Sequence, residues 1–203
     1  MKKSTVLNKG RSIIISPKIL EKIRANKLNT IILPITNKEL YEYGDYLYCK
    51  ESIIAIPNSN VETISFIKTN FKPKIENIVE ETYSDGYTYF YNLTNNKVKK
   101  YIESHNDKFY SVKQCPKDLS RTFLKVNTSC VCDVKSLSDD MLKSLNCKDI
   151  KDLIKLWDDI VNYYLDINTK NESQKTKLYK SSYCYDSNPM VQIINVDNID
   201  IIE

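Results

Sequence analysis

Apolar side chains recur at helical spacing in two stretches of the chain. The first follows Ser16 and Pro17, a serine cap and a first-turn proline, and predicts a short amphipathic helix over 18–24. The second begins at Asp149 and carries the apolar stripe of a longer helix: Leu153, Leu156, Trp157, Ile160, Val161 and Tyr164. Because Trp157 lies in the middle of this stripe, we expect it to anchor a core rather than to stack on a ligand.

Alternating or continuous apolar runs predict strands in the remaining sequence. The expected strands are 31–33, 46–51, 87–91, 122–134 and 190–196. The fourth run reads either as one bent strand or as two paired strands, and 168–180 reads as a charged loop. Strands separated by two helical regions and ending on a strand predict an α+β fold, a small mixed β-barrel with helices packed over its openings.

A polar stretch interrupts this pattern. Residues 58–107 are rich in Asn and Tyr and contain the turn signal Ser84-Asp85-Gly86. We interpret 58–107 as an insertion on the surface of one domain that spans 1–203.

Charge and cysteine content narrow the function classes. The net charge is +4, and of 30 basic residues only three are arginine. Lysine-rich surfaces favour loose contact with phosphate over the bidentate reading of base edges, although a mildly basic surface also serves solubility alone. Abundant Lys, Ile, Asn and Tyr with few glycines is typical of an AT-rich genome. No apolar run approaches the roughly 20 residues of a membrane span, and no signal peptide is visible.

The six cysteines suggest a reducing compartment and free thiols. They lack the ligand spacing of a zinc site, and His105 is distant from them in sequence. We therefore expect neither a metal nor a cofactor, and a cytoplasmic location.

Six short segments stand in a recognisable order: 25–35, 44–52, 115–121, 137–140, 156–160 and 188–191. The most specific is Leu156-Trp157-Asp158. Together they resemble the ASCH domain of the PUA-like superfamily, in its phage- and prophage-encoded branch, over roughly 17–196 without the insertion. The resemblance implies a compact β-barrel whose cleft is associated with RNA, nucleotides or modified nucleosides.

One bacterial branch of that family is an amidohydrolase that removes the acyl group from acetylated cytidine. Its chemistry uses a lysine, a threonine three residues later and a glutamate, and Lys27 and Thr30 match the first two. The resemblance places Leu145 at the glutamate position, and a leucine cannot transfer a proton. It therefore implies a module without catalysis.

The resemblance and the residue chemistry together select five candidate ligand residues: Lys27, Thr30, Tyr48, Glu51 and Arg121. Arg121 suits a phosphate or carboxylate, with an ion pair to Glu51 as the alternative. Tyr48 suits base stacking, with half-burial in the barrel as the alternative. For Lys27 and Thr30 the alternatives are a solvated lysine and a threonine at a strand entry.

Three functions remain. The first is a catalytically silent ASCH-like module that holds RNA, a nucleotide or a modified nucleoside in a basic cleft. The second is a virus- or mobile-element-encoded interaction protein whose insertion docks on a host or particle protein, acting in the host cytoplasm or with the virion. The third is an acetylcytidine-type amidohydrolase with a rearranged site.

Overall fold

The computed structural model describes residues 8–35, 40–71, 79–92, 98, 102 and 107–199. The chain divides into two compact units, one formed by Met1–Cys49 with Arg121–Glu203 and the other by Lys50–Ser120. Both units combine helices with a β-sheet, so the fold is α+β, as the sequence predicts. The expected insertion, 58–107, falls inside the second unit; its place in a single domain stays a prediction.

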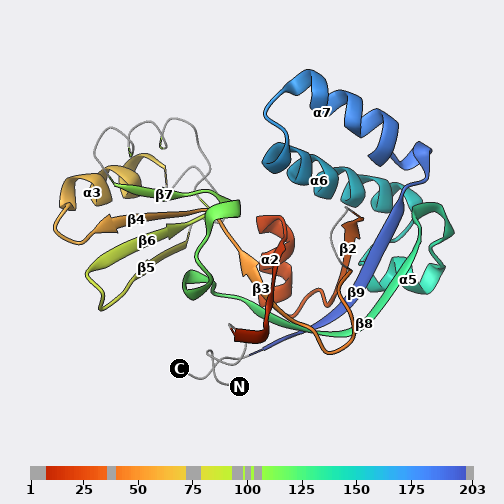
Figure 1. Ribbon diagram of the computed structural model, residues 1–203, viewed down its shortest axis with the longest axis horizontal. Coiled ribbons are helices and arrows are strands. Elements are labelled where there is room, and N and C mark those ends of the chain that lie inside the picture. Colours follow the sequence, from red (N-terminus) through yellow and green to blue (C-terminus); the bar gives the residue numbers. More distant parts are fainter. Residues whose placement is uncertain are drawn as a thin grey trace. The chain divides into compact units, whose positions relative to one another are not determined.

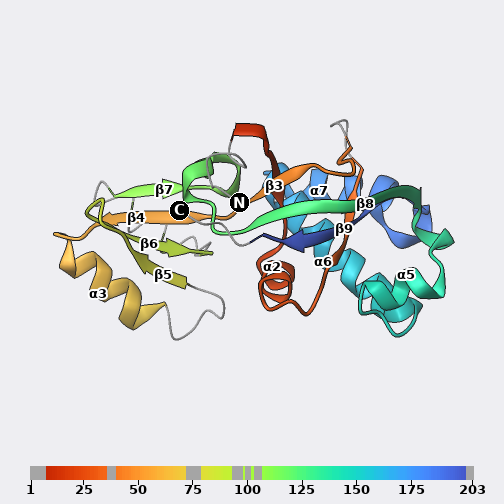
Figure 2. The same cartoon turned by 90° about the horizontal axis from the view of Figure 1, so that it is seen from below.

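The first unit is built on a five-stranded sheet in the order β1-β3-β8-β9-β2. These strands are Arg11–Ile14 (β1), Thr30–Pro34 (β2), Tyr46–Lys50 (β3), Phe123–Asp133 (β8) and Met190–Asn198 (β9). β8 is one long strand with an irregular register between Val126 and Thr128, and Figure 2 shows it running beside β9. Across the described residues, the strand order of this sheet begins at β1 and ends at β2, so the closed barrel that we expected is not seen.

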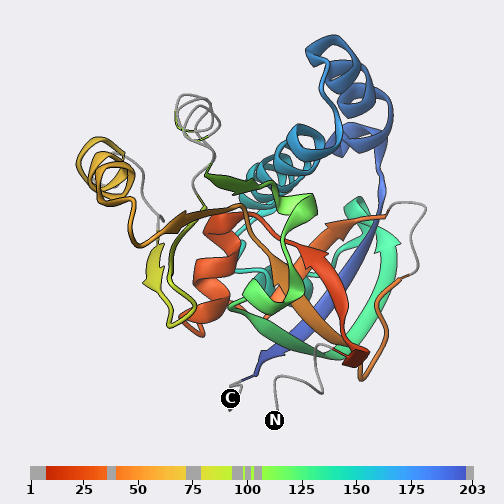
Figure 3. The same cartoon turned by 60° about the vertical axis from the view of Figure 1, so that its left-hand side comes forward.

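Helices that accompany this sheet are α2 (Pro17–Arg24), α5 (Asp139–Ser144), α6 (Ile150–Asn168) and α7 (Glu172–Leu178) (Figure 1). α2 and α6 confirm the two helices predicted from apolar spacing. α7 corrects the loop expected over 168–180, because the Asn171 side chain accepts bonds from the backbone N–H groups of Ser173 and Gln174 and so starts a helix. α6 and α7 lie side by side (Figures 1 and 3).

Trp157 is the largest fully buried side chain of the protein and lies in the core of the first unit with Leu20 of α2 and Ile194 of β9. Its indole N–H donates to the Tyr183 carbonyl oxygen at 2.6 Å. The expected role of Trp157 as a core anchor is confirmed. Of the described helices, none combines the length and the apolar character that crossing a bilayer requires.

The second unit is a four-stranded antiparallel sheet in the order β5-β6-β4-β7. Its strands are Ile53–Pro57 (β4), Val79–Thr82 (β5), Tyr87–Tyr91 (β6) and Lys108–Tyr110 (β7), and α3 spans Val61–Asn70. Ile54, Ile56 and Phe90 pack with Ile67 of α3 on one face. Because side chains alternate along a strand, Tyr87, Tyr89 and Tyr91 share the opposite face.

Candidate ligand pocket

A polar pocket of about 340 Å³ opens between the end of α2, the end of α5 and the end of β9. Lys27, Ser144 and Asp197 line it with four asparagines, Asn26, Asn29, Asn146 and Asn198. Its volume lies at the lower end of the range of small-molecule sites. Amide groups that each offer a donor and an acceptor therefore make up most of its polar lining.

Two helix ends build the wall around Lys27. α2 and α5 are followed by Asn26 and Asn146, with backbone φ of 52° and 59°, a left-handed conformation that asparagine tolerates at helix ends. The Lys27 N–H donates to the Lys22 carbonyl at 2.8 Å, which closes the first of these turns. The Asn146 side-chain amide donates to the Lys27 carbonyl at 2.8 Å and so joins the two helix ends.

Lys27 and Thr30 have different environments. Lys27 is exposed at the pocket, whereas Thr30 is 4% exposed and is not one of the lining residues. The Thr30 hydroxyl accepts from the side-chain amide of Asn195, its partner across the β2–β9 ladder, at 3.2 Å. The same hydroxyl donates to the side-chain oxygen of Asn29, a lining residue, at 3.3 Å, so it connects the sheet to the pocket wall without lining the pocket itself, which is closer to the strand-entry alternative.

Leu145 is 3% exposed and belongs to the apolar core, although its neighbours Ser144 and Asn146 both line the pocket. The segment beside Lys27 thus turns an aliphatic side chain inward, and Ser144 and Asn146 on either side of it line the pocket. The carboxylate of the pocket comes instead from Asp197, near the end of β9.

The other three predicted ligand residues lie elsewhere. Tyr48 is buried against Phe123, so it is not available as a stacking platform. Arg121 is half-buried and stands two residues before β8. Glu51 belongs to the second unit, where it is 3% exposed and accepts from the Asn92 side-chain amide at 3.1 Å. The pocket therefore contains Lys27 and none of the other four.

Comparison of the chain with family models, curated proteins and solved structures found no match. Assignment of the pocket consequently depends on its own chemistry. No group of three or more His, Cys, Asp and Glu among the described residues has the arrangement of a metal site, and the six cysteines are free thiols.

The four asparagines and Asp197 were not predicted from the sequence as pocket residues. Asn26 and Asn146 carry a local signal, an asparagine directly after the last apolar residue of a helix, which is typical of helix ends. That signal predicts a turn and gives no reason to expect a pocket. Asp197 and Asn198 reach the pocket because β9 pairs with β2, and no local sequence pattern predicts this position for them.

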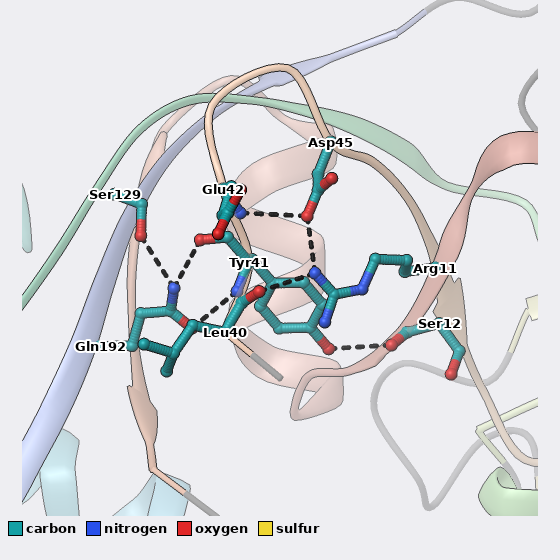
Figure 4. Close-up of polar contacts among 8 residues, drawn as sticks. All are labelled: Arg11, Ser12, Leu40, Tyr41, Glu42, Asp45, Ser129 and Gln192. Carbon is teal, nitrogen blue, oxygen red and sulfur yellow. Dashed lines mark hydrogen bonds and ion pairs between the residues drawn. The ribbon is translucent and has the colours of Figure 1, made fainter. Parts of the chain in front are cut away.

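A second polar cluster fixes the loop before β3 (Figure 4). Arg11 donates to the Asp45 carboxylate and to the Leu40 carbonyl, both at 2.7 Å, and its guanidinium lies 4.7 Å from the centre of the Tyr41 ring. The Tyr41 hydroxyl donates to the Ser12 carbonyl at 2.8 Å. The donors and acceptors of this cluster bond to one another, so we assign the cluster a structural role.

This cluster predicts a loss of stability at high pH. Burial raises the pKa of Tyr41 from 10.0 to about 12, although the nearby Arg11 charge acts in the opposite direction. A folded-state pKa above the unfolded one stabilises the protein below pH 10, and this contribution disappears as the pH rises through about 12. Urea unfolding of the wild type should therefore show falling stability across this interval.

In Tyr41→Phe the free energy of unfolding should fall less steeply with pH, because the variant lacks the Tyr41 hydroxyl proton whose loss destabilises the folded protein. Tyr43→Phe is the matched control, since Tyr43 is 78% exposed, and it should follow the wild-type slope. Tyr179, whose pKa the bond to Asp158 raises to about 12, supplies a remaining part of the decline. Equal slopes for Tyr41→Phe and the wild type would contradict the assignment.

Proposed function

We propose that the protein is a catalytically silent ASCH-like module that binds RNA, a nucleotide or a modified nucleoside in the pocket around Lys27. The observation that carries this proposal is the lining itself, in which a lysine stands among four side-chain amides. The amides match the donor and acceptor groups of a base edge, and the lysine suits a phosphate. The pocket volume suits a ligand of nucleotide size better than a duplex.

The absence of catalysis in this proposal follows from three side chains. Leu145 lies in the core, the Thr30 hydroxyl is bonded to Asn195, and Asp197 brings its carboxylate from a different strand. The Ser144 hydroxyl in the pocket lining donates to the Met141 carbonyl oxygen at 2.8 Å and not to a general base, an arrangement that favours binding over acyl transfer. Asp197 is the residue that a hydrolytic alternative would have to use.

The order of the sequence motifs supports a PUA-like origin for the chain over roughly 17–196 without 58–107, in a phage or prophage setting. The five-stranded sheet with flanking helices agrees with this proposal at the level of the α+β class. We accordingly propose a cytoplasmic protein, located in the host cytoplasm if a virus encodes it.

The proposal predicts a specific effect of Lys27→Ala. A fluorescent single-stranded RNA should bind the wild type at low salt, and its affinity should fall as salt rises. Loss of the Lys27 amine should weaken binding by about 5- to 10-fold, because one phosphate contact contributes on the order of 1 kcal/mol. The melting temperature should change little, since Lys27 is exposed.

Lys18→Ala is the matched control, because it removes the same charge from α2 at an exposed position outside the pocket. If Lys27→Ala and Lys18→Ala weaken RNA binding equally, the effect comes from overall charge, and the proposal that RNA binds in the pocket is contradicted. Acetate release from acetylcytidine that disappears in Asp197→Asn would instead establish the hydrolase. Stable association with a host or particle protein, without nucleic-acid affinity, would favour the interaction protein.

A further inference from the structure

Two of the six cysteines stand two residues apart on β8. Cys130 lies opposite Ile193 of β9 and Cys132 lies opposite Val191, in a regular part of the ladder between β8 and β9. Because side chains alternate along a strand, the two thiols project from the same face of the sheet. Val131, which stands between them, projects from the other face.

The two thiols are accessible and contact each other. Cys130 is exposed and Cys132 is half-buried, and both are free thiols. The Cys132 thiol makes a side-chain hydrogen bond with Cys130, so the two sulfurs are near neighbours. The structure therefore brings two sulfur ligands together at the surface, whereas the free thiols of Cys49, Cys115 and Cys147 are buried.

A disulfide is the less suitable product of this pair. Residues two apart on a strand have Cα atoms about 6.6–6.8 Å apart, at the upper limit of the distance that a disulfide spans. Burial, the Cys130 thiol and the Asp133 charge raise the pKa of Cys132, although the Ser136 hydroxyl acts in the opposite direction. Redox-sensing cysteines have a lowered pKa. The pair is better suited to share an ion, which holds the sulfurs farther apart than the roughly 2 Å of an S–S bond.

The number of available ligands selects the ion. Within the described part of the chain, no third His, Cys, Asp or Glu side chain joins the two thiols in a metal-binding arrangement. A structural Zn²⁺ site takes four protein ligands, and Ca²⁺ and Mg²⁺ take oxygen ligands. Monovalent copper is bound preferentially by soft thiolates, and two of them are sufficient for it. The sequence expectation of no metal considered the spacing of zinc ligands, which a two-ligand ion does not need.

We propose that Cys130 and Cys132 form a surface site that binds one monovalent copper ion between two thiolates. Binding forms two copper–sulfur bonds, and the two thiol protons pass to water. Neither the sulfurs nor the ion change oxidation state, so the step needs no oxidant or reductant. This inference goes beyond the ligand pocket around Lys27 and does not depend on it.

The test is an oxygen-free titration of the reduced full chain with monovalent copper in competition with bicinchoninate, whose coloured copper complex reports the ion that the protein does not hold. The wild type should withdraw one copper ion per chain. Cys130→Ser and Cys132→Ser should each weaken copper binding by more than about 100-fold, because even outer-shell partners of metal ligands contribute about 10- to 100-fold. Cys184→Ser removes a half-buried free thiol elsewhere and should bind copper as the wild type does.

Two double variants test whether the shared face of the strand, rather than the number of thiols, is responsible. Both carry Cys132→Ser. Adding Thr128→Cys places a thiol two residues from Cys130 on the same face, and this variant should regain copper binding. Adding Val131→Cys places the thiol on the opposite face, and this variant should not regain it. Thr128 and Val131 are both exposed, so the comparison does not depend on core packing.

Four results would overturn the proposal. They are a wild type that leaves all copper with bicinchoninate, copper retained in Cys130→Ser, copper lost in Cys184→Ser, and equal binding by the two double variants. If Cys132→Ser fails to fold, Cys130→Ser still decides against Cys184→Ser, because the Cys130 side chain is exposed and its replacement leaves the core intact.

Discussion

Replacing Trp157 with alanine should lower the free energy of unfolding by about 3–5 kcal/mol, the range measured for large-to-small changes in packed cores. The indole is fully buried in the core of the first unit, so its removal leaves a cavity as well as a loss of buried apolar area. It also leaves the Tyr183 carbonyl without the 2.6 Å bond from the indole. In a chain of this size the melting temperature should fall by roughly 10 °C.

The measurement is urea unfolding followed by circular dichroism, because the variant has no tryptophan fluorescence. Trp157→Phe should cost less than the alanine change, since the ring refills part of the cavity and only the hydrogen bond is lost entirely. Ile150→Ala is the control on the same helix, where the side chain is 54% exposed. A cost for Trp157→Ala no larger than that of Ile150→Ala would contradict the anchor role.

Much of the first unit was predictable because local patterns determine it. The stripe through Leu153, Trp157 and Val161 follows the helical period, and these three side chains are buried in α6. The β-branched and apolar run that begins at Phe123 became one strand, and the register irregularity after Val126 allows it to continue to Asp133. The expected closed barrel is not seen because closure depends on pairing between the outer strands β1 and β2, which no local pattern specifies.

The core of the second unit was missed although it left a signal. Ile53, Ile54, Ala55 and Ile56 form a short apolar run before Pro57, which is typical of a strand buried on both faces. The run was not among the expected strands, because the polar segment 58–107 that follows it was interpreted as a surface insertion and no partner strand for the run was expected there. Composition averages over a segment, whereas a core of this size needs only a few well-placed side chains.

Lys27 was the one ligand candidate found in the pocket, and the reason is local. A lysine directly after a helix end is exposed wherever the helix packs, so its sequence position is informative. Tyr48 and Glu51 depend on tertiary packing: the first is covered by Phe123 and the second is buried with Asn92. Sequence alone does not state which face of a strand an amphipathic residue will occupy.

Gln192 illustrates the same limit and carries the second large prediction. It lies on β9, is 3% exposed, and bonds to both backbone groups of Tyr41: its oxygen accepts from the Tyr41 N–H at 3.3 Å and its amide donates to the Tyr41 carbonyl at 2.7 Å (Figure 4). The amide also donates to the Ser129 hydroxyl at 2.8 Å. The Gln192 side chain therefore gives the backbone of the loop at Tyr41 the two hydrogen bonds that a neighbouring strand would otherwise make.

Gln192→Leu keeps the volume and removes all three bonds. The two backbone groups of the half-buried Tyr41 then lose their partner, and each polar group left unpaired away from water costs on the order of 1 kcal/mol or more, whereas the exposed Ser129 hydroxyl can bond to water instead. We expect the free energy of unfolding to fall by about 2–4 kcal/mol. Val131→Leu, opposite Gln192 on β8 with 37% exposure, is the control and should have a small effect.

Gln192→Glu tests whether the hydrogen-bonding pattern, rather than shape, is responsible. A protonated carboxyl can accept from the Tyr41 N–H and donate to the Tyr41 carbonyl, whereas an ionised one can only accept and is buried as a charge. Burial should raise the pKa of this glutamate above its unfolded value of about 4.3, so its cost relative to wild type is small at low pH and grows as the pH rises through that pKa. Urea unfolding of variant and wild type at about pH 4.5 and about pH 7.5 measures the difference. An equal cost at the two pH values would mean that the amide fills space and does not serve as the partner strand of the loop.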